Sequence, residues 1–325
     1  MKYFVTGATG FIGSHLVSQL IKRGHRVNAL VRDTRKAEDL KNMGVSVFRG
    51  DITEKESMRK PMEGTDGIFH VAGLYKLGIR DRRMAERINV EGTRNVLELS
   101  KELLIKKGVY TSTLSVYSDT RGKTVDESYR FTGRHISVYD ETKWRAHYEV
   151  ALPLMENGLP LVIVLPGAVY GPGDTSAIGD ALKACIRGEL KIIPKGTIFC
   201  WSYIEDIVHG HILAMEKGKP GESYIIAGPP ARIEDVFLLI EKLSGIKGPK
   251  KRSNPHILRL MSILMKGIEL FVKPSVTFSS EGLRVMAGAT YLASNRKAKE
   301  ELGYSPRSLE EGMRETVEHL MREQG

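Results

Sequence analysis

The chain has 325 residues, 41% of them hydrophobic and 27% charged, which is the composition of a globular protein long enough to bury a core without disulfides or metals. Its two cysteines, Cys185 and Cys200, are far apart and form no CxxC motif, which excludes a disulfide scaffold and a cysteine-ligated zinc site. The net charge of +10 would suit a nucleic acid or an anionic membrane, but the basic residues are scattered and no nucleic-acid-binding motif accompanies them, so we expect no nucleic-acid partner.

The N-terminus, "MKYFVTGATG", leads directly into a predicted strand and a glycine turn. A secretory leader would instead show a charged segment followed by an apolar one. No run of about eighteen apolar residues, the length that crosses a bilayer, occurs in the sequence. We therefore predict a cytoplasmic protein.

Short β-rich runs alternate with amphipathic helical patterns through the first half of the chain. The predicted strands are 2–7, 26–32, 45–50, 67–73, 108–113 and 161–166, and the helical patterns between them include 11–24 and 82–108. Strands that alternate with helices form right-handed βαβ units and a parallel sheet covered on both faces. The fold class predicted is therefore α/β, with a Rossmann-type doubly wound parallel sheet.

The pattern changes after Pro166, where loops become rich in glycine and proline and strands separate the helices less regularly. Two further strands are predicted at 196–204 and 222–228. We expect a dinucleotide-binding Rossmann domain at 1–165, to which the chain returns near 196–228. Residues 166–325 would form mainly a smaller, mostly helical substrate-binding domain, with the substrate in the cleft between the two.

The stretch "TGATGFIG" places Gly7, Gly10 and Gly13 between the first predicted strand and the first predicted helix. One glycine permits a tight turn, one lets the backbone approach a pyrophosphate, and one lets the helix pack closely on the strand. The free N–H groups at the start of the helix then face the phosphates. The motif predicts a nicotinamide dinucleotide cofactor, NADP or NAD.

The end of the second predicted strand bears on the choice between these cofactors. NAD sites commonly place an acidic residue there on the ribose 2′-hydroxyl, whereas an arginine accommodates the 2′-phosphate of NADP. The sequence "ALVRDTRK" supplies Arg32, Arg35 and Lys36 around Asp33. Three cations favour NADP, and Asp33 leaves NAD open as the alternative.

The stretch "VYDETKW" carries a tyrosine and a lysine four residues apart, Tyr139 and Lys143, which a helix would place on one face. About one such pair is expected by chance in this chain, so the surroundings decide its meaning. The preceding strand ends in "VYTSTLSVY", which adds small hydroxyl side chains at the same edge of the sheet. A nearby Lys⁺ and an oxidised nicotinamide would lower the pKa of the phenol from about 10, so that it could act as a general acid–base.

With these motifs in place, the chain resembles the extended short-chain dehydrogenases/reductases of the NAD-dependent epimerase/dehydratase group. Within that group it is most similar to dihydroflavonol-reductase-like and hopanoid-associated sugar epimerase-like proteins. The resemblance runs nearly from end to end and includes "VTGATGFIGSHL", "FHVAGLYKLG", "NVEGTRNVLE", "YDETK", "LPGAVYGPGD" and "WSYIEDIVHGHILAME". It implies an NAD(P)-dependent oxidoreductase.

The resemblance assigns roles to particular residues. The catalytic residues would be Thr113, Tyr139 and Lys143, with Ser112 and Ser115 as hydroxyl neighbours that could be mistaken for Thr113. Together with the charge argument for Arg32 and Arg35, the cofactor site would comprise Gly7, Thr9, Gly10, Phe11, Ile12, Gly13, Arg32, Arg35, Asp51, Ile52, Val71, Ala72, Gly73, Thr111, Tyr139, Lys143, Pro166, Gly167 and Val169.

One departure from the family pattern concerns the substrate. Nucleotide-sugar epimerases and dehydratases usually carry an arginine that meets the sugar diphosphate, and the matching stretch here, "FCWSYIED", has Phe199 in its place. We therefore expect a small, fairly apolar carbonyl or secondary alcohol, with Tyr75, Lys76, Ser115 and Trp201 as substrate-site residues. The alternative is an enzyme that retains NAD and epimerises or dehydrates a nucleotide sugar.

Three weaker patterns complete the predictions. The "HGH" at 209–211 lacks further ligands at suitable spacing, so we predict no metal site. The segment 255–272 has an apolar stripe beside Arg259 and Lys266; we expect a helix that covers the cleft or the core, with a peripheral membrane contact as the alternative. By resemblance, long helices at 83–107 and 138–157 could pair two chains into a homodimer.

Overall fold

The computed structural model describes residues 1–79, 81–269, 271–272, 274 and 276–323. Its centre is a seven-stranded sheet in the order β10-β6-β5-β4-β1-β2-β3, and every neighbouring pair is parallel. The strands are β1 Lys2–Thr6, β2 Arg26–Val31, β3 Ser46–Arg49, β4 Gly67–His70, β5 Gly108–Thr111, β6 Leu161–Pro166 and β10 Ser223–Ile226. Both the predicted strands and the predicted Rossmann-type fold class are confirmed.

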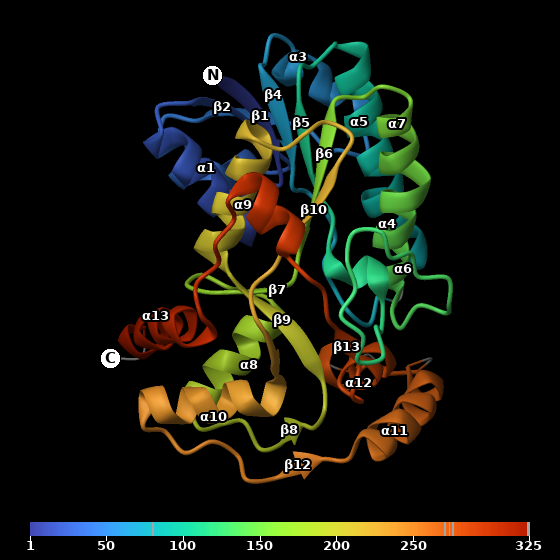
Figure 1. The fold of residues 1–325 in the computed structure, drawn as a ribbon, viewed down its shortest axis with the longest axis vertical. Coiled ribbons are helices and arrows are strands. Elements are labelled where there is room, and N and C mark those ends of the chain that lie inside the picture. The colour runs from blue at the N-terminus through green and yellow to red at the C-terminus, as the bar shows by residue number, and fades with distance from the viewer. Residues whose placement is uncertain (80, 270, 273, 275, 324–325) are drawn as a thin grey trace.

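Helices cover both faces of this sheet (Figure 1). One face carries α1 Phe11–Lys22 and α9 Ile204–Glu216, which contact each other. The other carries α4 Arg82–Glu86, α5 Gly92–Glu102, α6 Val138–Arg145 and α7 Leu152–Glu156, and π-helical turns join α4 to α5 and α6 to α7. The short helices α2 Glu38–Asn42 and α3 Arg59–Met62 complete the crossovers. Because both faces are covered, the central strands are almost continuously apolar.

The second half of the chain builds a smaller body beside the carboxyl ends of the sheet (Figure 1). Its strands are β7 Ala168–Tyr170, β9 Ile198–Tyr203, β11 Pro230–Arg232 and β13 Thr290–Tyr291, with β9 central, and a separate pair β8 Ile193–Pro194 and β12 Arg252–Ser253. Its helices are α8 Ala177–Ile186, α10 Ile233–Ser244, α11 Pro255–Ile268, α12 Ser280–Val285 and α13 Leu309–Arg322. The predicted strand at 196–204 exists as β9, but it belongs to this smaller sheet, while α9 and β10 return to the large one.

Two features of the helices bear on the sequence predictions. The predicted helix at 255–272 is observed as α11, and Leu270 lies outside the described residues. None of the described helices combines the length and the apolar composition that a membrane span needs.

Candidate active site

A large cleft lies between the sheet and the smaller body. Its volume is about 2450 Å³, well above the 300–1,000 Å³ typical of one small ligand, so it has room for a dinucleotide and a substrate together. The cleft runs along the carboxyl ends of β1, β4, β5 and β6. The order of the strands reverses at β1, which has β2 on one side and β4 on the other, and such a switch point is where open α/β sheets bind ligands.

The glycine turn between β1 and α1 forms one end of the cleft. Gly7 has φ +73°, in the left-handed region, and a Cβ there would lie 2.7 Å from the Ala72 backbone nitrogen. A Cβ on Gly13 would lie only 2.0 Å from the Gly7 carbonyl oxygen, so the helix can approach the strand only without a side chain. The N-cap residue Gly10 has no side chain to cap the first N–H groups of α1, which therefore remain available to an anion. These features fit a dinucleotide pyrophosphate.

The predicted cofactor residues line this cleft, with one exception. Arg32, Asp51 and Ile52 lie at the end beyond the glycine turn, and Val71–Gly73, Thr111 and Pro166–Val169 follow toward Tyr139. Arg35 is the exception: its guanidinium instead donates to both carboxylate oxygens of Asp33, from Nε and Nη2, each at 2.9 Å. Hydrogen bonds from Arg35 also hold the pKa of Asp33 below its usual range.

Tyr139 lies in the first turn of α6 and projects into the cleft. Thr113, which follows β5 and which the sequence favoured over its serine neighbours, is the neighbour whose hydroxyl lowers the pKa of Tyr139. Ser112 is instead buried against His147, with Oγ 2.9 Å from Nδ1. The ring of Tyr75 meets Tyr139 edge-on, with centroids 4.9 Å apart. Thr113, Tyr139 and Tyr75 are thus brought together, and Lys76, Ser115 and Trp201 line the same cleft.

Lys143 lies one turn after Tyr139 and is buried behind it. Its ammonium donates to the Tyr110 hydroxyl at 3.0 Å and to the Thr111 carbonyl oxygen at 2.9 Å. These two bonds use two of its three donors, which leaves one for a ligand in the cleft. Burial lowers the pKa of Lys143 to about 7.

The pKa of Tyr139 differs from the sequence expectation. Burial raises it above its usual value of about 10, only the Thr113 hydroxyl opposes this substantially, and Lys143 does not lower it. The expectation that Lys143 depresses this pKa is wrong for the protein without cofactor, because the two groups do not pair directly and Lys143 is itself desolvated. The phenol therefore carries its proton, which is the form that can protonate a carbonyl oxygen.

Buried hydroxyl and imidazole groups form a hydrogen-bonded network behind Lys143. Tyr110 stacks on His70, with centroids 5.4 Å apart, and shares a hydrogen bond with Thr93. His70 is also bonded to Thr93, with Nε2 3.0 Å from Oγ1, and to Thr6 on its other ring nitrogen at 2.8 Å. Because burial lowers the pKa of His70 to about 3, this histidine is neutral and adds no charge beside the lysine.

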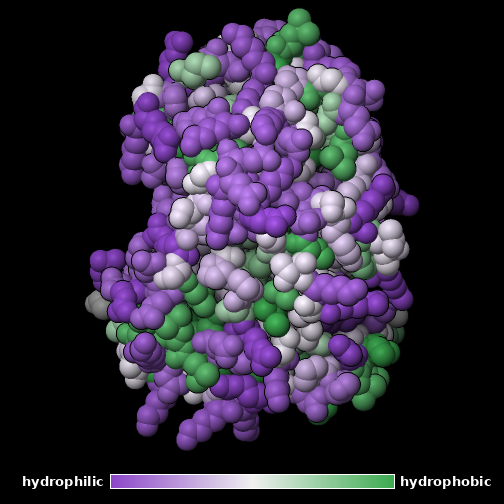
Figure 2. All heavy atoms as spheres, in the orientation of Figure 1, coloured by the Kyte–Doolittle hydropathy of each residue, from purple (hydrophilic) through white to green (hydrophobic). Residues whose placement is uncertain are grey.

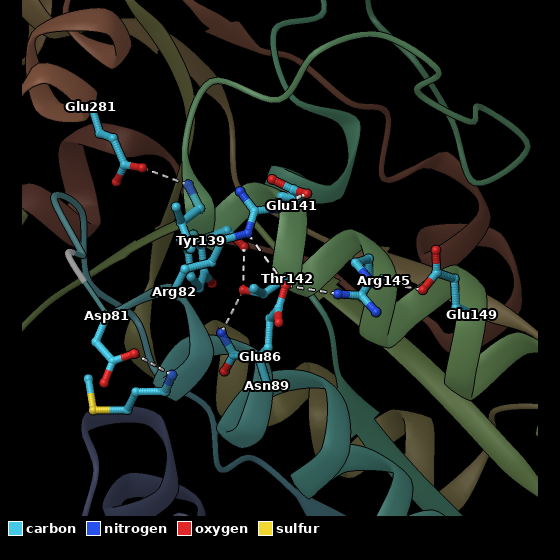
Figure 3. A network of polar contacts seen from close by, with 12 residues as sticks. Asp81, Arg82, Glu86, Asn89, Tyr139, Glu141, Thr142, Arg145, Glu149 and Glu281 are labelled. Carbon is cyan, nitrogen blue, oxygen red and sulfur yellow. Dashed lines mark hydrogen bonds and ion pairs between the residues drawn. The ribbon is translucent and has the colours of Figure 1, made fainter. Parts of the chain in front are cut away.

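Polar contacts fix the helix that carries Tyr139 and Lys143 (Figure 3). Asn89 donates to Thr142 of α6 at 3.0 Å and accepts from the Leu74 backbone N–H at 2.7 Å, so it ties the loop after β4 to α6. Arg145 adds an ion pair to Glu86 of α4 at 3.0 Å. Glu281 of α12 accepts from the Val138 N–H at 2.8 Å at the start of α6. The site is therefore held on both sides of the cleft.

His209 and His211 of the "HGH" motif both lie on α9. His211 is buried; its Nδ1 donates to the Ile207 carbonyl oxygen at 2.7 Å, so its Nε2 accepts from the Thr111 hydroxyl at 2.8 Å. Within the part of the chain that the structure describes, no three His, Cys, Asp or Glu side chains are grouped for a metal ion.

A match over most of the chain identifies the family to which it belongs. Residues 3–227 match the family described as the NAD dependent epimerase/dehydratase family, and this segment contains the glycine turn, Thr113, Tyr139 and Lys143. The chain belongs to the NAD-dependent epimerase/dehydratase family. It is an enzyme of the extended short-chain dehydrogenase/reductase type, as the sequence predicted, and an oxidoreductase that depends on a nicotinamide dinucleotide.

Several curated members of this family are similar to the chain over nearly their whole length. A protein of Synechocystis named as a dihydroflavonol 4-reductase is 28% identical over 97% of this chain and 93% of its own. A ketoreductase of Stigmatella aurantiaca, named for a 4-farnesyl-dihydroquinoline-1-oxide, is 29% identical over 94% and 92%. The human sterol-4-alpha-carboxylate 3-dehydrogenase (decarboxylating) is 28% identical over 98% and 88%.

A solved structure supports the fold independently. The crystal structure of gox2253 superposes with a TM-score of 0.85 at 30% identity, and the match covers 99% of this chain and 98% of that one. Solved UDP-sugar epimerases at 24% identity share the same fold.

Sequence analysis did not identify three residues that shape this site. Tyr110 and Asn89 lie within the family motifs, but their contacts to Lys143 and Thr142 join segments that are 33 and 53 residues apart in the chain. Asp140 follows Tyr139 and is buried, accepting from Ser137 Oγ at 2.7 Å and from the Tyr291 hydroxyl at 3.1 Å. The one sequence feature that could have pointed to Asp140 is the presence of an acidic residue inside a helix that has little hydrophobic surface.

Two buried titratable groups, Asp140 and Lys143, contribute to the pH dependence of stability in the cofactor-free protein with opposite signs. Burial raises the pKa of Asp140 from 3.8 to about 7, so between these values the folded state binds the extra proton and stability falls as pH rises. Burial lowers the pKa of Lys143 from 10.5 to about 7, so above pH 7 the unfolded state binds the extra proton and stability rises. Taken alone, these two contributions to the unfolding free energy pass through a minimum near pH 7, each arm worth a few kcal/mol. Buried histidines such as His70, whose pKa is lowered to about 3, add an opposite slope below pH 6.5, so the two contributions are measured as differences from matched variants.

Denaturant unfolding between pH 4 and 10 tests this profile. Asp140→Asn mimics the neutral acid, so the stability of wild type relative to this variant should fall between pH 4 and 7 and then stay constant. The stability of wild type relative to Lys143→Met should stay constant up to pH 7 and then rise. Parallel curves for wild type and both variants would show that neither pKa is shifted.

Proposed function

We propose that this enzyme transfers a hydride between NADP(H) and a carbonyl or secondary alcohol of an apolar substrate, with Tyr139 as the acid–base. The observation that carries the proposal is the aromatic wall at the substrate end of the cleft. Phe199 packs against Tyr291 and Trp201, with ring centroids 5.6 and 6.0 Å apart. An arginine in its place would offer a sugar diphosphate two charged donors, whereas this wall offers only apolar surface.

The neighbours of this wall are also apolar. Leu77, Ile136 and Met286 pack with Phe199 around the buried residues Val285 and Tyr291. The indole N–H of Trp201 is already used by the Ala231 carbonyl oxygen at 3.1 Å, so it offers a substrate its ring rather than its donor. The names of the relatives agree with such a substrate, since they refer to a dihydroflavonol, a farnesylated dihydroquinoline-1-oxide and a sterol carboxylate.

The side chains around Tyr139 define how the chain would perform this reaction. A bound reduced cofactor supplies the hydride that the carbonyl carbon receives. The protonated phenol of Tyr139 then donates its proton to the oxygen, while the Thr113 hydroxyl orients that oxygen. Lys143 keeps one N–H free at the floor of the cleft, where it can hold the cofactor ribose and return a proton toward the phenol.

Nucleotide content tests the proposal without knowledge of the substrate. We expect protein purified and denatured for mass spectrometry to release little nucleotide, to bind added NADPH, and to oxidise it in the presence of ketones drawn from polycyclic and prenylated classes. Tightly retained NAD, with turnover of UDP-sugars and none of apolar ketones, would instead support the epimerase or dehydratase alternative and contradict the proposal.

The preference for NADP rests on charges at the adenosine end of the cleft. Arg32 is exposed and lines the cleft, while Arg35 engages Asp33, the acid that would otherwise repel a 2′-phosphate. We expect Arg32→Ala to weaken NADPH binding by about 10- to 100-fold, the worth of a charge-assisted hydrogen bond, and to leave NADH binding nearly unchanged.

Fluorescence titration with both cofactors measures this difference. Lys36→Ala is the matched control, because it removes a neighbouring exposed charge that does not line the cleft. Equal losses for NADPH and NADH in Arg32→Ala would mean that Arg32 contacts a group common to both cofactors, and the NADP preference would be wrong.

A further inference from the structure

The helix α11 leaves most of its surface uncovered. Ser262 is its only buried residue among those described, and the helix packs on α12. Nine of the sixteen large apolar side chains that are exposed in the described part of the chain lie in the segment 257–278. Eight of them form what we call the α11 apolar face: Ile257, Leu260, Met261, Ile263, Leu264, Ile268, Phe271 and Phe278.

Most of the α11 apolar face is open to solvent, while two of its members, Met261 and Phe278, lie at the edge of the cleft. Ile257, Met261, Leu264 and Ile268 follow the spacing i, i+4, i+7 and i+11, which places them on one side of the helix. Leu264 is 61% exposed and Ile263, on the flank of this stripe, is 70% exposed. Figure 2 shows hydrophobic residues gathered at the lower right, where α11 lies in Figure 1. A patch of this kind on a soluble protein marks an interaction surface.

The charge of α11 and of the segment before it has a single sign, and the first acidic residue after them, Glu269, is bonded to Ser280. Residues 245–268 contain no aspartate or glutamate and six cationic side chains, all exposed: Lys247, Lys250, Lys251, Arg252, Arg259 and Lys266. Four of these cations precede the helix and two lie on it. An exposed apolar helix face with a basic border is the pattern of helices that lie in the interface of an anionic membrane.

We propose that the α11 apolar face docks on the surface of a lipid bilayer that contains anionic lipids. A second copy of the chain is a poorer occupant, because a two-fold contact through this face would bring the two basic borders together. The helix has 14 residues, far fewer than the roughly 20 that a spanning helix needs, so it would lie along the surface. Its apolar side chains would enter the acyl boundary while the cations meet lipid phosphates.

Docking would also place the cleft at the membrane. Leu258, Met261 and Lys266 of α11 line the cleft, as does Phe278 beyond it, so the apolar face continues into the substrate end. This part rests on the proposed function: an apolar substrate could pass from the bilayer to the aromatic wall at Phe199 without crossing water.

Vesicle sedimentation tests the docking without any substrate. We expect the wild-type protein to sediment with vesicles of phosphatidylcholine and phosphatidylglycerol at 3:1, to bind weakly to phosphatidylcholine alone, and to be released in part by high salt, which screens the lipid charge. Absence of binding to the anionic vesicles would overturn the proposal, whatever the enzyme turns over.

Matched variants identify the surface. Ile263→Glu with Leu264→Glu should reduce binding by at least about tenfold, as should Lys250→Glu with Lys251→Glu. Leu238→Glu, at a position of α10 that is 52% exposed and outside the face, should bind like wild type. Unchanged melting temperatures verify that each variant is folded. If Leu238→Glu lost as much vesicle binding as Ile263→Glu with Leu264→Glu, the assignment of the binding surface to α11 would be overturned.

A dye on α11 separates insertion from surface adhesion. The natural cysteines, Cys185 and Cys200, are buried, so Leu264→Cys can be labelled selectively with an environment-sensitive fluorophore. We expect a blue shift on anionic vesicles, and an unchanged spectrum would contradict insertion of the apolar face. Sedimentation velocity without lipid tests whether a second copy of the chain occupies this face instead. If the wild-type protein were a dimer and Leu264→Glu made it monomeric, the face would be a dimer interface and the proposal would be overturned.

Discussion

Replacing Tyr139 with phenylalanine should reduce turnover by about 10²- to 10⁴-fold, the range that positioned proton transfer contributes. The hydroxyl is the only group removed, and both Tyr139 and Thr113 line the cleft. Because burial raises the pKa of this phenol, the wild-type group is protonated at neutral pH and is ready to donate to a carbonyl oxygen. The measurement is kcat with the best ketone from the carbonyl panel.

The affinity for NADPH and the melting temperature should stay close to wild type in Tyr139→Phe. Tyr304→Phe is the matched control: it removes another buried tyrosine hydroxyl, one that has no hydrogen-bond partner among the described residues and lies outside the cleft. This control should retain activity. If Tyr139→Phe kept more than about a tenth of the wild-type rate, another group would have to supply the proton and the acid–base role would be wrong.

The fold was predictable because its signals are local. Each βαβ unit is marked by a short apolar run, a turn and an amphipathic helix, so the strands from β1 to β6 and β10 match the predicted segments within a few residues. The glycine turn was predictable for a related reason, since Gly7 and Gly13 occupy positions where any side chain would strike the backbone. The short strands β7, β11 and β13 were missed because they owe their pairing to β9 rather than to their own sequence.

The electrostatics of the site were less predictable, because they depend on contacts between distant segments. The spacing of Tyr139 and Lys143 suggested that the lysine acts directly on the phenol, yet its ammonium is held by Tyr110 and by the Thr111 carbonyl from β5. Burial then determines both pKa values, and burial is a property of the folded chain. Likewise, counting cations after β2 gave no sign that Arg35 would turn back to pair with Asp33.

A methyl group added at Gly13 should be the most damaging small change to cofactor binding. Its Cβ would lie 2.0 Å from the Gly7 carbonyl oxygen and 2.7 Å from the Gly7 carbonyl carbon, both of them backbone atoms that cannot rotate away. Helix α1 would have to move off β1, which carries its N-terminal N–H groups away from the pyrophosphate position. We expect Gly13→Ala to lose more than about 100-fold in NADPH affinity and about 1–3 kcal/mol in unfolding free energy.

The neighbouring glycines make this a graded test of the mechanism. A Cβ on Gly10 would meet the same Gly7 oxygen at 3.2 Å, a contact that a shift of a few tenths of an ångström relieves, so Gly10→Ala should lose less affinity than Gly13→Ala. Gly24 has φ +78°, and a methyl group added there would meet no atom within 4 Å, so Gly24→Ala should cost only about 1 kcal/mol of backbone strain and leave cofactor binding intact. If Gly13→Ala bound NADPH as tightly as Gly24→Ala, the dinucleotide would have to bind somewhere other than on this turn.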